Sequence, residues 1–300
     1  CVTCHDPQFD LTDKANTSTG VAKVDRNSPA IALASHSRWQ FWDGRIDTLW
    51  GQALGPPEDA KEIGSSRLFI AHQLATRYEA AYNAAFGVKY PLPVADIAAL
   101  PASGKPGDAA YDALSAADKE KVTRVYVNMG KAIAAFERAL RVKPNALDRY
   151  IDGDTSALTT DQKHALTSFF KNGCAQCHWG PRLTDDAFHN VRFGTGRQDG
   201  MADPGRETGL KKLAAAEFAA SSKWSDAPAS AKTFDVADAP AMLGAFKTPT
   251  LRGLPTSAPY GHGGTLATLL DVTHQYGIRG LEHADPGAVG STEQWAPNFD

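Results

Sequence analysis

The sequence predicts an all-α fold of two domains with long loops. Its length of 300 residues suits about two folded domains. The hydrophobic fraction of 42% is too high for a disordered chain. Apolar residues recur at three- and four-residue spacing, as on one face of a helix, whereas strand-like alternation is scarce between 195 and 245. One short motif occurs twice, 173 residues apart. We therefore expect domains of 1–152 and 153–300, with the boundary near 150–156.

The longest expected helix covers Lys119–Val142, between the two copies of the motif. Its apolar face would consist of Val122, Val125, Met129, Ile133, Phe136 and Leu140. A Lys-Pro-Asn sequence at 143–145 would end it, because proline does not continue a helix. Turn-forming residues predict a loop over 100–108, before this helix.

Two more helices are expected around and after the second copy of the motif. The first would have Thr160 or Asp161 as its N-cap and run to Cys174. The second would cover Leu266–Tyr276, with its leucines on one side.

The net charge of −3, with no basic stripe, gives no reason to expect nucleic-acid binding. No run of residues approaches the roughly 18 apolar positions that a membrane-spanning helix needs. Both classes of protein are therefore set aside.

All four cysteines lie in the repeated motif, Cys1-Val-Thr-Cys4-His5 and Cys174-Ala-Gln-Cys177-His178. A disulfide framework would scatter its cysteines, and a redox dithiol does not need the histidine. C-x-x-C-H is typical of covalent haem attachment, because two thiols reach the two vinyl groups and the histidine binds the iron. A single copy could arise by chance or bind zinc. Two copies that use every cysteine predict two haems c, with His5 and His178 as iron ligands.

Haem c is assembled outside the bacterial cytoplasm, so we expect an exported, periplasmic protein. The numbering opens on a haem cysteine, and we expect further N-terminal residues, a signal peptide among them, to lie outside this chain.

Several separated blocks resemble those of the bacterial di-haem cytochrome c peroxidases and their relative MauG, in the same order along nearly the whole chain. These blocks are Asn27-Ser-Pro29, Gln40-Phe-Trp-Asp-Gly-Arg45, Gln52-Ala-Leu-Gly-Pro56, Phe246-Lys-Thr-Pro-Thr-Leu-Arg252, and Ala258-Pro-Tyr260 followed by His262. The resemblance implies two cytochrome c-like domains. Hydrogen peroxide would react at the N-terminal haem, and the C-terminal haem would store or relay an oxidising equivalent.

The resemblance also assigns residues around the N-terminal haem. Trp42 would couple the two haems; the alternative is a core aromatic residue. Glu62 would move a proton from the near to the far oxygen of the peroxide, although a surface glutamate is the commoner fate. Gln52 would hydrogen-bond an oxygen on the iron, and Pro56 would crowd the open face.

A calcium ion between the domains is implied by three further matches. Asn27, Ser257 and Pro259 stand at the family's calcium positions, with serine in place of the usual threonine. An amide oxygen and two backbone carbonyls suit this hard cation.

The chain departs from the peroxidases where many of them carry a capping histidine on the peroxidatic iron. That position is Thr19 here, so we expect the N-terminal haem to be open without reductive activation. His36 is the alternative cap, but we favour a structural role for it.

A second departure concerns the far ligand of the C-terminal haem. Where the peroxidases have methionine, Tyr276 stands here, as in MauG, and a phenolate stabilises ferric and higher states. His274 competes for this role, because only one of the two can face inward.

We therefore expect a periplasmic di-haem oxidoreductase that reacts with hydrogen peroxide. Its electron donor would be a small cytochrome c, a cupredoxin or a residue of a protein substrate, and a homodimer is compatible with the sequence. The alternative is a di-haem electron-transfer cytochrome without peroxidase activity; haem-based sensing is weaker, because no output domain is attached. The sequence does not separate peroxide detoxification from a protein-modifying oxidation, and it gives no role to the segment 209–244.

Overall fold

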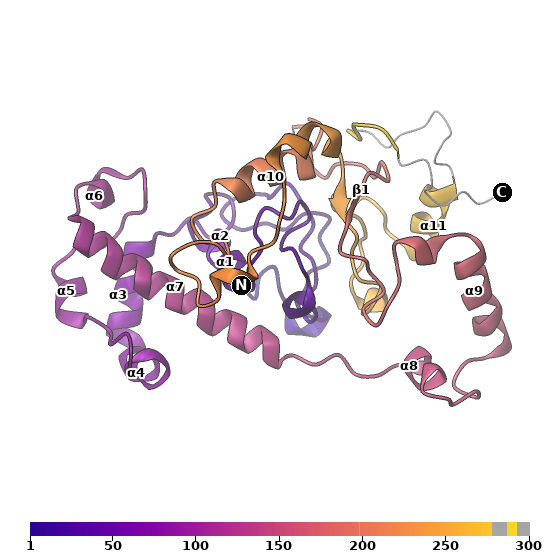
Figure 1. The fold of residues 1–300 in the computed structure, drawn as a ribbon, viewed down its shortest axis with the longest axis horizontal. Coiled ribbons are helices and arrows are strands. Elements are labelled where there is room, and N and C mark those ends of the chain that lie inside the picture. Colours follow the sequence, from indigo (N-terminus) through magenta and orange to yellow (C-terminus); the bar gives the residue numbers. More distant parts are fainter. Residues whose placement is uncertain (198, 278–286, 293–300) are drawn as a thin grey trace.

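The computed structural model describes residues 1–197, 199–277 and 287–292, and their regular secondary structure is almost entirely helical (Figure 1). The first helices are α1 (Leu49–Gln52), α2 (Gly55–Glu58), α3 (Arg67–Arg77), α4 (Glu79–Phe86), α5 (Val94–Ala98), α6 (Ala109–Asp112) and α7 (Ala116–Ala139). The later ones are α8 (Ala146–Ile151), α9 (Thr160–Lys171), α10 (Arg206–Ala214) and α11 (Leu269–Gly277). Short 3-10 segments lie at Pro7–Phe9, Ala34–His36, Cys174–Gln176, Pro228–Ser230, Val236–Met242 and Leu254–Thr256.

The described residues contain two short β-strands. β1 (Phe188–His189) and β2 (Phe246–Lys247) pair antiparallel, and the remainder of the described chain is helix, turn and loop. The predicted all-α class is therefore confirmed. The predicted loop over 100–108 is also present, between α5 and α6.

The predicted long helix is α7, which begins three residues earlier than expected. Ser115 caps it, because its hydroxyl accepts a hydrogen bond from the Asp118 amide at 3.1 Å. The helix ends at Ala139, before Pro144.

The buried face of α7 differs from the predicted one near its C-terminal end. Val122 and Val125 are buried as expected, whereas Phe136 is 60% exposed, so its assignment to the apolar face is wrong. Ala134 and Glu137 are buried there instead. The face of α7 that meets the core near its C-terminal end is therefore not the face that carries Phe136.

The helices α3 to α7 gather at one end of the molecule and enclose the first core (Figure 1). Its buried residues are Leu68, Ala71, Ala75, Tyr82, Leu92, Ile97, Tyr111, Val122 and Val125.

A second core joins the two halves of the chain. Trp50 and Leu54 pack with Tyr126 of α7, and Phe218 and Trp224 complete this cluster. The Phe218 ring centroid lies 6.1 Å from those of both Trp50 and Tyr126. Part of the segment 209–244 thus returns from α10 to α1 and covers the N-terminal half (Figure 1).

After α7, the chain crosses to the other end of the molecule through α8 and α9 (Figure 1). Turns occupy 152–158, where we expected the domain boundary. The N-cap of α9 is Thr159 rather than Thr160 or Asp161, because Thr159 and Gln162 form a reciprocal capping box. The helix stops at Lys171 and does not reach Cys174, which opens a separate 3-10 turn.

The last predicted helix is α11, and it starts at Leu269 instead of Leu266. Thr268 accepts a hydrogen bond from the Asp271 amide at 3.1 Å, and Asp271 accepts one from the Thr268 amide at 2.8 Å. This reciprocal cap fixes the start, while Leu266 forms a bridge with Tyr260.

No helix among the residues that the structure describes combines the length and the apolar character needed to cross a membrane.

Candidate active site

A single cavity of about 760 Å³ collects side chains from both halves of the chain. Nearly all the residues singled out in the sequence line it: Cys4, His5, Asn27, Trp42, Gln52, Pro56, Glu62, Cys174, Cys177, His178, Ser257, Pro259 and Tyr276. Cys1 is exposed and does not contribute to this lining. The volume lies in the range of cofactor pockets.

The first C-x-x-C-H motif forms a tight turn. The amides of Cys4 and His5 both donate to the Cys1 carbonyl, at 3.1 and 2.8 Å. His5 Nδ1 lies 3.0 Å from the Leu11 carbonyl oxygen. Because a carbonyl oxygen only accepts, Nδ1 carries the proton and Nε2 keeps a lone pair, which is the form that binds iron. Burial lowers the pKa of His5, which favours the same neutral form.

The second motif repeats this arrangement. The amides of Cys177 and His178 donate to the Cys174 carbonyl, at 3.4 and 3.0 Å. His178 Nδ1 lies 3.1 Å from the Leu183 carbonyl oxygen, so its Nε2 is also the free ligand atom. Burial lowers the pKa of His178 as well.

The residues present fit covalently bound haem. No disulfide joins any of the four cysteines. Both histidines present the correct nitrogen, and a cation also faces the cavity: Arg192 lines it and has a buried Nε with no hydrogen-bond partner in the described structure. An unpaired buried guanidinium nitrogen suits the carboxylate of a haem propionate.

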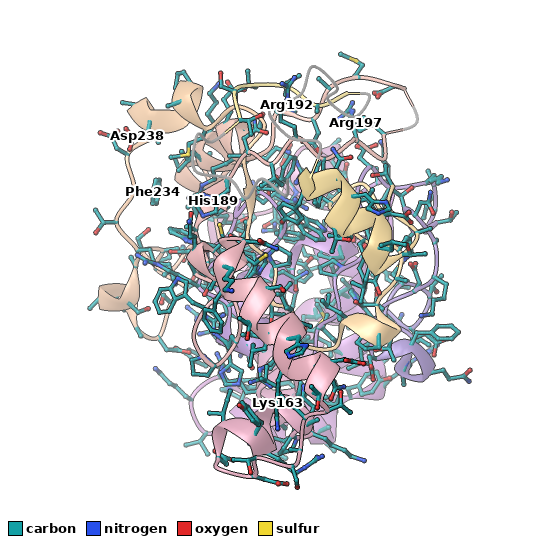
Figure 2. All side chains as sticks on the ribbon, turned by 90° about the vertical axis from the view of Figure 1, so that its right-hand side faces the viewer. Lys163, His189, Arg192, Arg197, Phe234 and Asp238 are labelled. Carbon is teal, nitrogen blue, oxygen red and sulfur yellow. The ribbon has the colours of Figure 1, made fainter. Side chains whose placement is uncertain are left out.

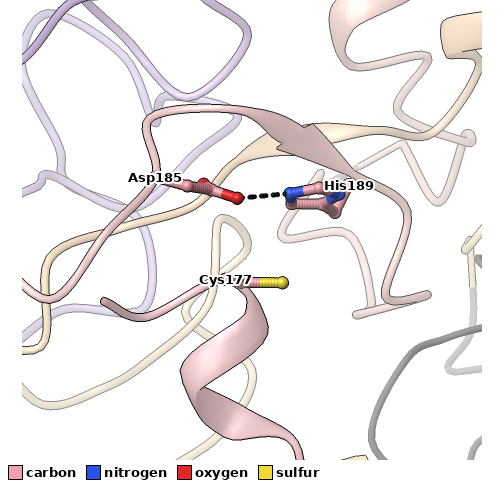
Figure 3. Close-up of side chains that lie close together, drawn as sticks. All are labelled: Cys177, Asp185 and His189. Atoms are coloured by element: carbon pink, nitrogen blue, oxygen red, sulfur yellow. Dashed lines mark hydrogen bonds and ion pairs between the residues drawn. The ribbon is translucent and has the colours of Figure 1, made fainter. Parts of the chain in front are cut away.

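Asp185 and His189 lie next to Cys177, and Figure 2 labels His189. His189 Nε2 is 2.9 Å from an Asp185 carboxylate oxygen, and the Cys177 sulfur lies within 4.8 Å of their ligand atoms (Figure 3). Burial lowers the pKa of His189, but Asp185 and Cys177 outweigh it and raise the pKa to about 10. These three side chains have the spacing of a metal site, but a Cys177 sulfur bound to a haem vinyl group is a thioether and no longer a thiolate ligand. Asp185 could have been noticed from its position four residues before His189.

Gln52, Pro56 and Glu62 all line the cavity. Gln52 ends α1, which Thr48 caps, and Pro56 stands in the first turn of α2. Glu62 lies in the loop that follows α2 and is half-buried.

The surroundings of Glu62 shift the pKa of its carboxyl group. Burial and the neighbouring charge of Asp59 raise its pKa, and Arg45 opposes them. Arg45 also lines the cavity, with its guanidinium 3.5 Å from the Phe41 ring centroid and an ion pair to Asp43 at 3.2 Å. Arg45 belongs to the Gln40–Arg45 block, but no role for it was expected from the sequence.

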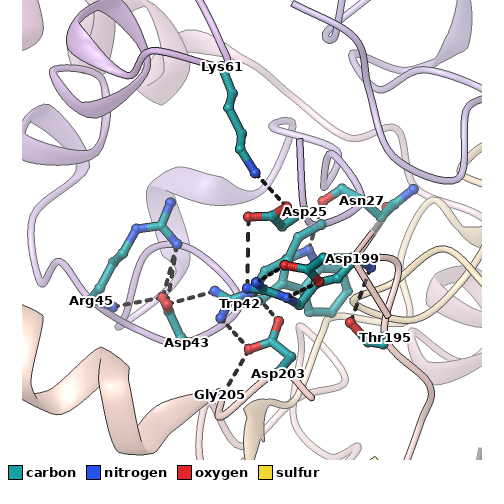
Figure 4. A network of polar contacts seen from close by, with 12 residues as sticks. Asp25, Asn27, Trp42, Asp43, Arg45, Lys61, Thr195, Asp199, Asp203 and Gly205 are labelled. Atoms are coloured by element: carbon teal, nitrogen blue, oxygen red, sulfur yellow. Dashed lines mark hydrogen bonds and ion pairs between the residues drawn. The ribbon is translucent and has the colours of Figure 1, made fainter. Parts of the chain in front are cut away.

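Trp42 is held between the halves (Figure 4). Its indole Nε1 donates to the Asn27 carbonyl at 2.9 Å, and its own carbonyl accepts from the Lys247 amide at 2.9 Å. The Asn27 amide in turn donates to the His262 carbonyl at 2.8 Å. Two of these three bonds cross from the N-terminal to the C-terminal half.

The side-chain amide of Asn27 is oriented by its neighbours. Its Nδ2 donates to the carbonyls of Ala15 and Asn16, at 3.2 and 3.3 Å. The Oδ1 is therefore the atom left for a ligand. Together with carbonyl oxygens at Ser257 and Pro259 it would form the donor set that calcium prefers.

A buried charge network that sequence reasoning missed lies beside Trp42 (Figure 4). Arg26 bridges Asp43 and Asp203, with N–O distances of 2.6 and 2.7 Å. Burial opposes ionisation of Asp43, but Arg45 and Arg26 lower its pKa to about 2. Asp43 is 1% exposed, and such a buried carboxylate requires these partners. The bridge from Arg26 to Asp203 is a further link between the halves.

The two candidate iron ligands, Tyr276 and His274, lie in different surroundings. Tyr276 lines the cavity and packs edge-on against Phe193, at 5.4 Å between ring centroids, whereas His274 is exposed and outside the lining. Thr19 and His36 are likewise exposed and outside it.

The family model of the di-haem cytochrome c peroxidases matches residues 1–156. Among curated proteins, the chain is 30% identical over 288 residues to the methylamine utilization protein MauG of Methylorubrum extorquens, covering 94% of this chain. It is 29% identical over 276 residues to the cytochrome c551 peroxidase of Pseudomonas aeruginosa, covering 90% of this chain. The chain spans 64% of the length of each of these two relatives.

Solved structures share the fold. The diheme peroxidase BthA of Burkholderia thailandensis superposes with a TM-score of 0.68 at 19% identity, over 93% of this chain and 66% of that one. A MauG-like protein associated with microbial copper homeostasis gives a TM-score of 0.59 at 22% identity, over 100% of this chain and 76% of that one.

Proposed function

Because this chain belongs to the di-haem cytochrome c peroxidase family, we propose that it is a periplasmic di-haem oxidoreductase that reacts with hydrogen peroxide. The observation that carries the proposal is the shared cavity. Both C-x-x-C-H motifs, the acid Glu62 and the indole of Trp42 line one space. A pure electron carrier does not need an acid with a raised pKa beside its cofactor.

In this proposal the chain holds two haems covalently, one in each of two cytochrome c-like domains, 1–152 and 153–300. Cys1, Cys4 and His5 bind the N-terminal haem, and Cys174, Cys177 and His178 bind the C-terminal one. When bound, the haems supply the electrons that break the O–O bond of the peroxide.

Side chains of the protein carry out the proton transfer. Glu62 takes a proton from the peroxide oxygen nearer the iron and delivers it to the far oxygen, which leaves as water. Gln52 donates a hydrogen bond to the near oxygen, and Pro56 limits the space over it. The raised pKa of Glu62 brings its proton affinity closer to neutral pH, where such an exchange is most effective.

Trp42 couples the two halves, since its hydrogen bonds reach Asn27 on one side and Lys247 on the other. Tyr276 would hold the iron of the C-terminal haem together with His178, and its place in the cavity wall favours it over His274. Asn27, Ser257 and Pro259 would hold a calcium ion. The electrons that complete the reaction come from a small cytochrome c, a cupredoxin or a residue of a protein substrate.

The test of the proposed function is to mix the haem-loaded ferric protein with one equivalent of hydrogen peroxide. We expect a rapid change in the visible and near-infrared spectra without any reductant, because neither Thr19 nor His36 lines the cavity as a cap. Reaction only after one haem is reduced would contradict the open site and favour a gated peroxidase. No reaction in any redox state would favour the electron-transfer cytochrome.

Replacing Tyr276 with phenylalanine tests the far ligand. The variant removes one oxygen while keeping the ring against Phe193, so we expect the spectrum of the C-terminal haem to change from six- to five-coordinate iron. His274→Ala is the matched control and should leave the spectrum as it is, because His274 is exposed. The opposite pattern, a change in His274→Ala alone, would assign the ligand to His274.

A further inference from the structure

The loop that carries Glu62 is paired with a hairpin from the start of the chain. The amide of Val21 donates to the Glu62 carbonyl at 2.9 Å, and the amide of Ala22 donates to the Lys61 carbonyl at 2.9 Å. The Lys61 ammonium also reaches Asp25 at 2.8 Å (Figure 4). Three contacts thus join segments that are about 40 residues apart in the sequence.

The hairpin itself is tight. Thr19 and Lys23 form a bridge, and the Val24 amide donates to the Ser18 carbonyl at 3.0 Å. Ser18 and Val24 line the cavity, whereas Thr19 is exposed. The base of the hairpin therefore lies in the cavity wall, and its tip reaches the backbone of Glu62.

Gly20 is the closest point of this contact. A Cβ atom at position 20 would lie 2.0 Å from the Glu62 carbonyl oxygen and 2.7 Å from that of Lys61. Both neighbours are backbone atoms, so no side chain can turn aside to make room. The φ angle of Gly20 is not positive, so the requirement for glycine here is one of space.

The same loop is fixed from its other side by Asp59. The Asp59 carboxylate accepts hydrogen bonds from the amides of Lys61 and Glu62, at 2.8 and 3.1 Å. The amide and the carbonyl of Glu62 are therefore both held, by different segments.

We propose that the hairpin 18–24 positions Glu62 for proton transfer, and that Gly20 is the positioning residue through which it acts. This inference rests on the proposed function. Proton transfer requires the carboxyl oxygens within hydrogen-bond reach of the peroxide, and a displacement of about 1 Å can cost on the order of 10²-fold in rate. A residue larger than glycine at position 20 pushes the Glu62 backbone by at least that much.

The test compares Gly20→Ala with Gly87→Ala in the haem-loaded protein. Gly87 is the matched control, because a Cβ there would meet the Asn83 carbonyl oxygen at 2.5 Å, in a helix end that does not line the cavity. We expect Gly20→Ala to slow the reaction with hydrogen peroxide by about 10-fold or more, and Gly87→Ala to change it less than about 2-fold. Hydrogen exchange at the amides of Val21 and Ala22 should accelerate in Gly20→Ala alone.

Two further measurements separate positioning from a general structural effect. In a Glu62→Gln background, Gly20→Ala should slow the reaction no further, because the group that it positions is gone. Binding of hydrogen cyanide to the ferric protein gives a readout without turnover, since this probe loses a proton on binding and Glu62 is placed to accept it. Its association rate should fall in Gly20→Ala and in Glu62→Gln to a similar extent.

An unchanged rate in Gly20→Ala would overturn the inference, and so would an equal slowing by Gly20→Ala with and without Glu62. Failure of the proposed function gives a different result. A wild-type protein that binds cyanide with this dependence on Gly20 and Glu62, yet does not react with peroxide, would overturn the peroxidase and leave the positioning of Glu62 supported.

Discussion

The Glu62→Gln variant should react with hydrogen peroxide about 10²-fold more slowly than the wild-type protein, or slower still, while both haem spectra stay nearly intact. Glutamine keeps the size of the side chain and the backbone contacts to Val21 and Asp59, but it cannot exchange a proton at neutral pH. The measurement is the single-turnover rate of the haem-loaded protein. Glu79→Gln, an exposed glutamate of α4, is the matched control and should react as the wild type does.

The pH dependence of that rate follows from the pKa of Glu62. Burial and Asp59 raise this pKa above the ordinary value of 4.5, so on acidification the proton-accepting carboxylate is lost at a higher pH than for an exposed glutamate. The wild-type rate should therefore fall as pH decreases through that raised pKa, and this decline should be absent in Glu62→Gln. A wild-type rate in the variant, or the same acid decline in both proteins, would remove Glu62 from the mechanism.

The sequence predicted the contents of the cavity better than the contacts that hold them. The C-x-x-C-H motifs are local, and their turn geometry follows from five consecutive residues, as the bonds to the Cys1 and Cys174 carbonyls illustrate. The resemblance added Gln52, Pro56 and Glu62, all of which line the same cavity. Their chemical roles remain proposals.

The contacts that were not predicted join residues far apart in the chain. Arg26 pairs with Asp203 across 177 positions, and neither has a local pattern that distinguishes it from a surface charge. The ends of helices were predicted less well than their existence. A helix shows a periodic pattern over many residues, whereas its start depends on a single capping side chain. The apolar period suggested a start at Leu266, but Thr268 and Asp271 form the cap three residues later.

Replacing Arg67 with leucine should lower the free energy of unfolding by about 3 kcal/mol, measured by urea denaturation of the haem-loaded protein. Arg67 is only 3% exposed, and its guanidinium binds Glu58 on one side, at 2.9 Å, and Glu217 on the other, at 3.0 Å. Burial opposes its charge, but hydrogen bonds to these two carboxylates raise its pKa, so it stays ionised. Leucine fills part of the volume and leaves the Glu58 carboxylate without its cationic partner, although the backbone amide of residue 67 still donates to it. Lys121→Leu is the control, because its pairs with Asp96 and Asp118 are exposed and should cost less than about 1 kcal/mol.

A second variant shows whether the loss arises from the stranded charge or from packing. Glu58 is the less exposed of the two acids, at 17% against 44% for Glu217, so most of the cost of Arg67→Leu should come from Glu58. Adding Glu58→Gln to Arg67→Leu removes that charge, and we expect it to restore part of the lost stability, because deleting both members of a buried pair costs less than deleting one. If the double variant is no more stable than Arg67→Leu, the stranded charge is not the source of the loss, and the lost contacts of the guanidinium with the rings of Tyr111, Tyr126 and Phe218 account for it. Either result concerns the contact between the two halves of the chain, because Arg67 of α3 pairs with Glu58 of α2 and with Glu217, which follows α10.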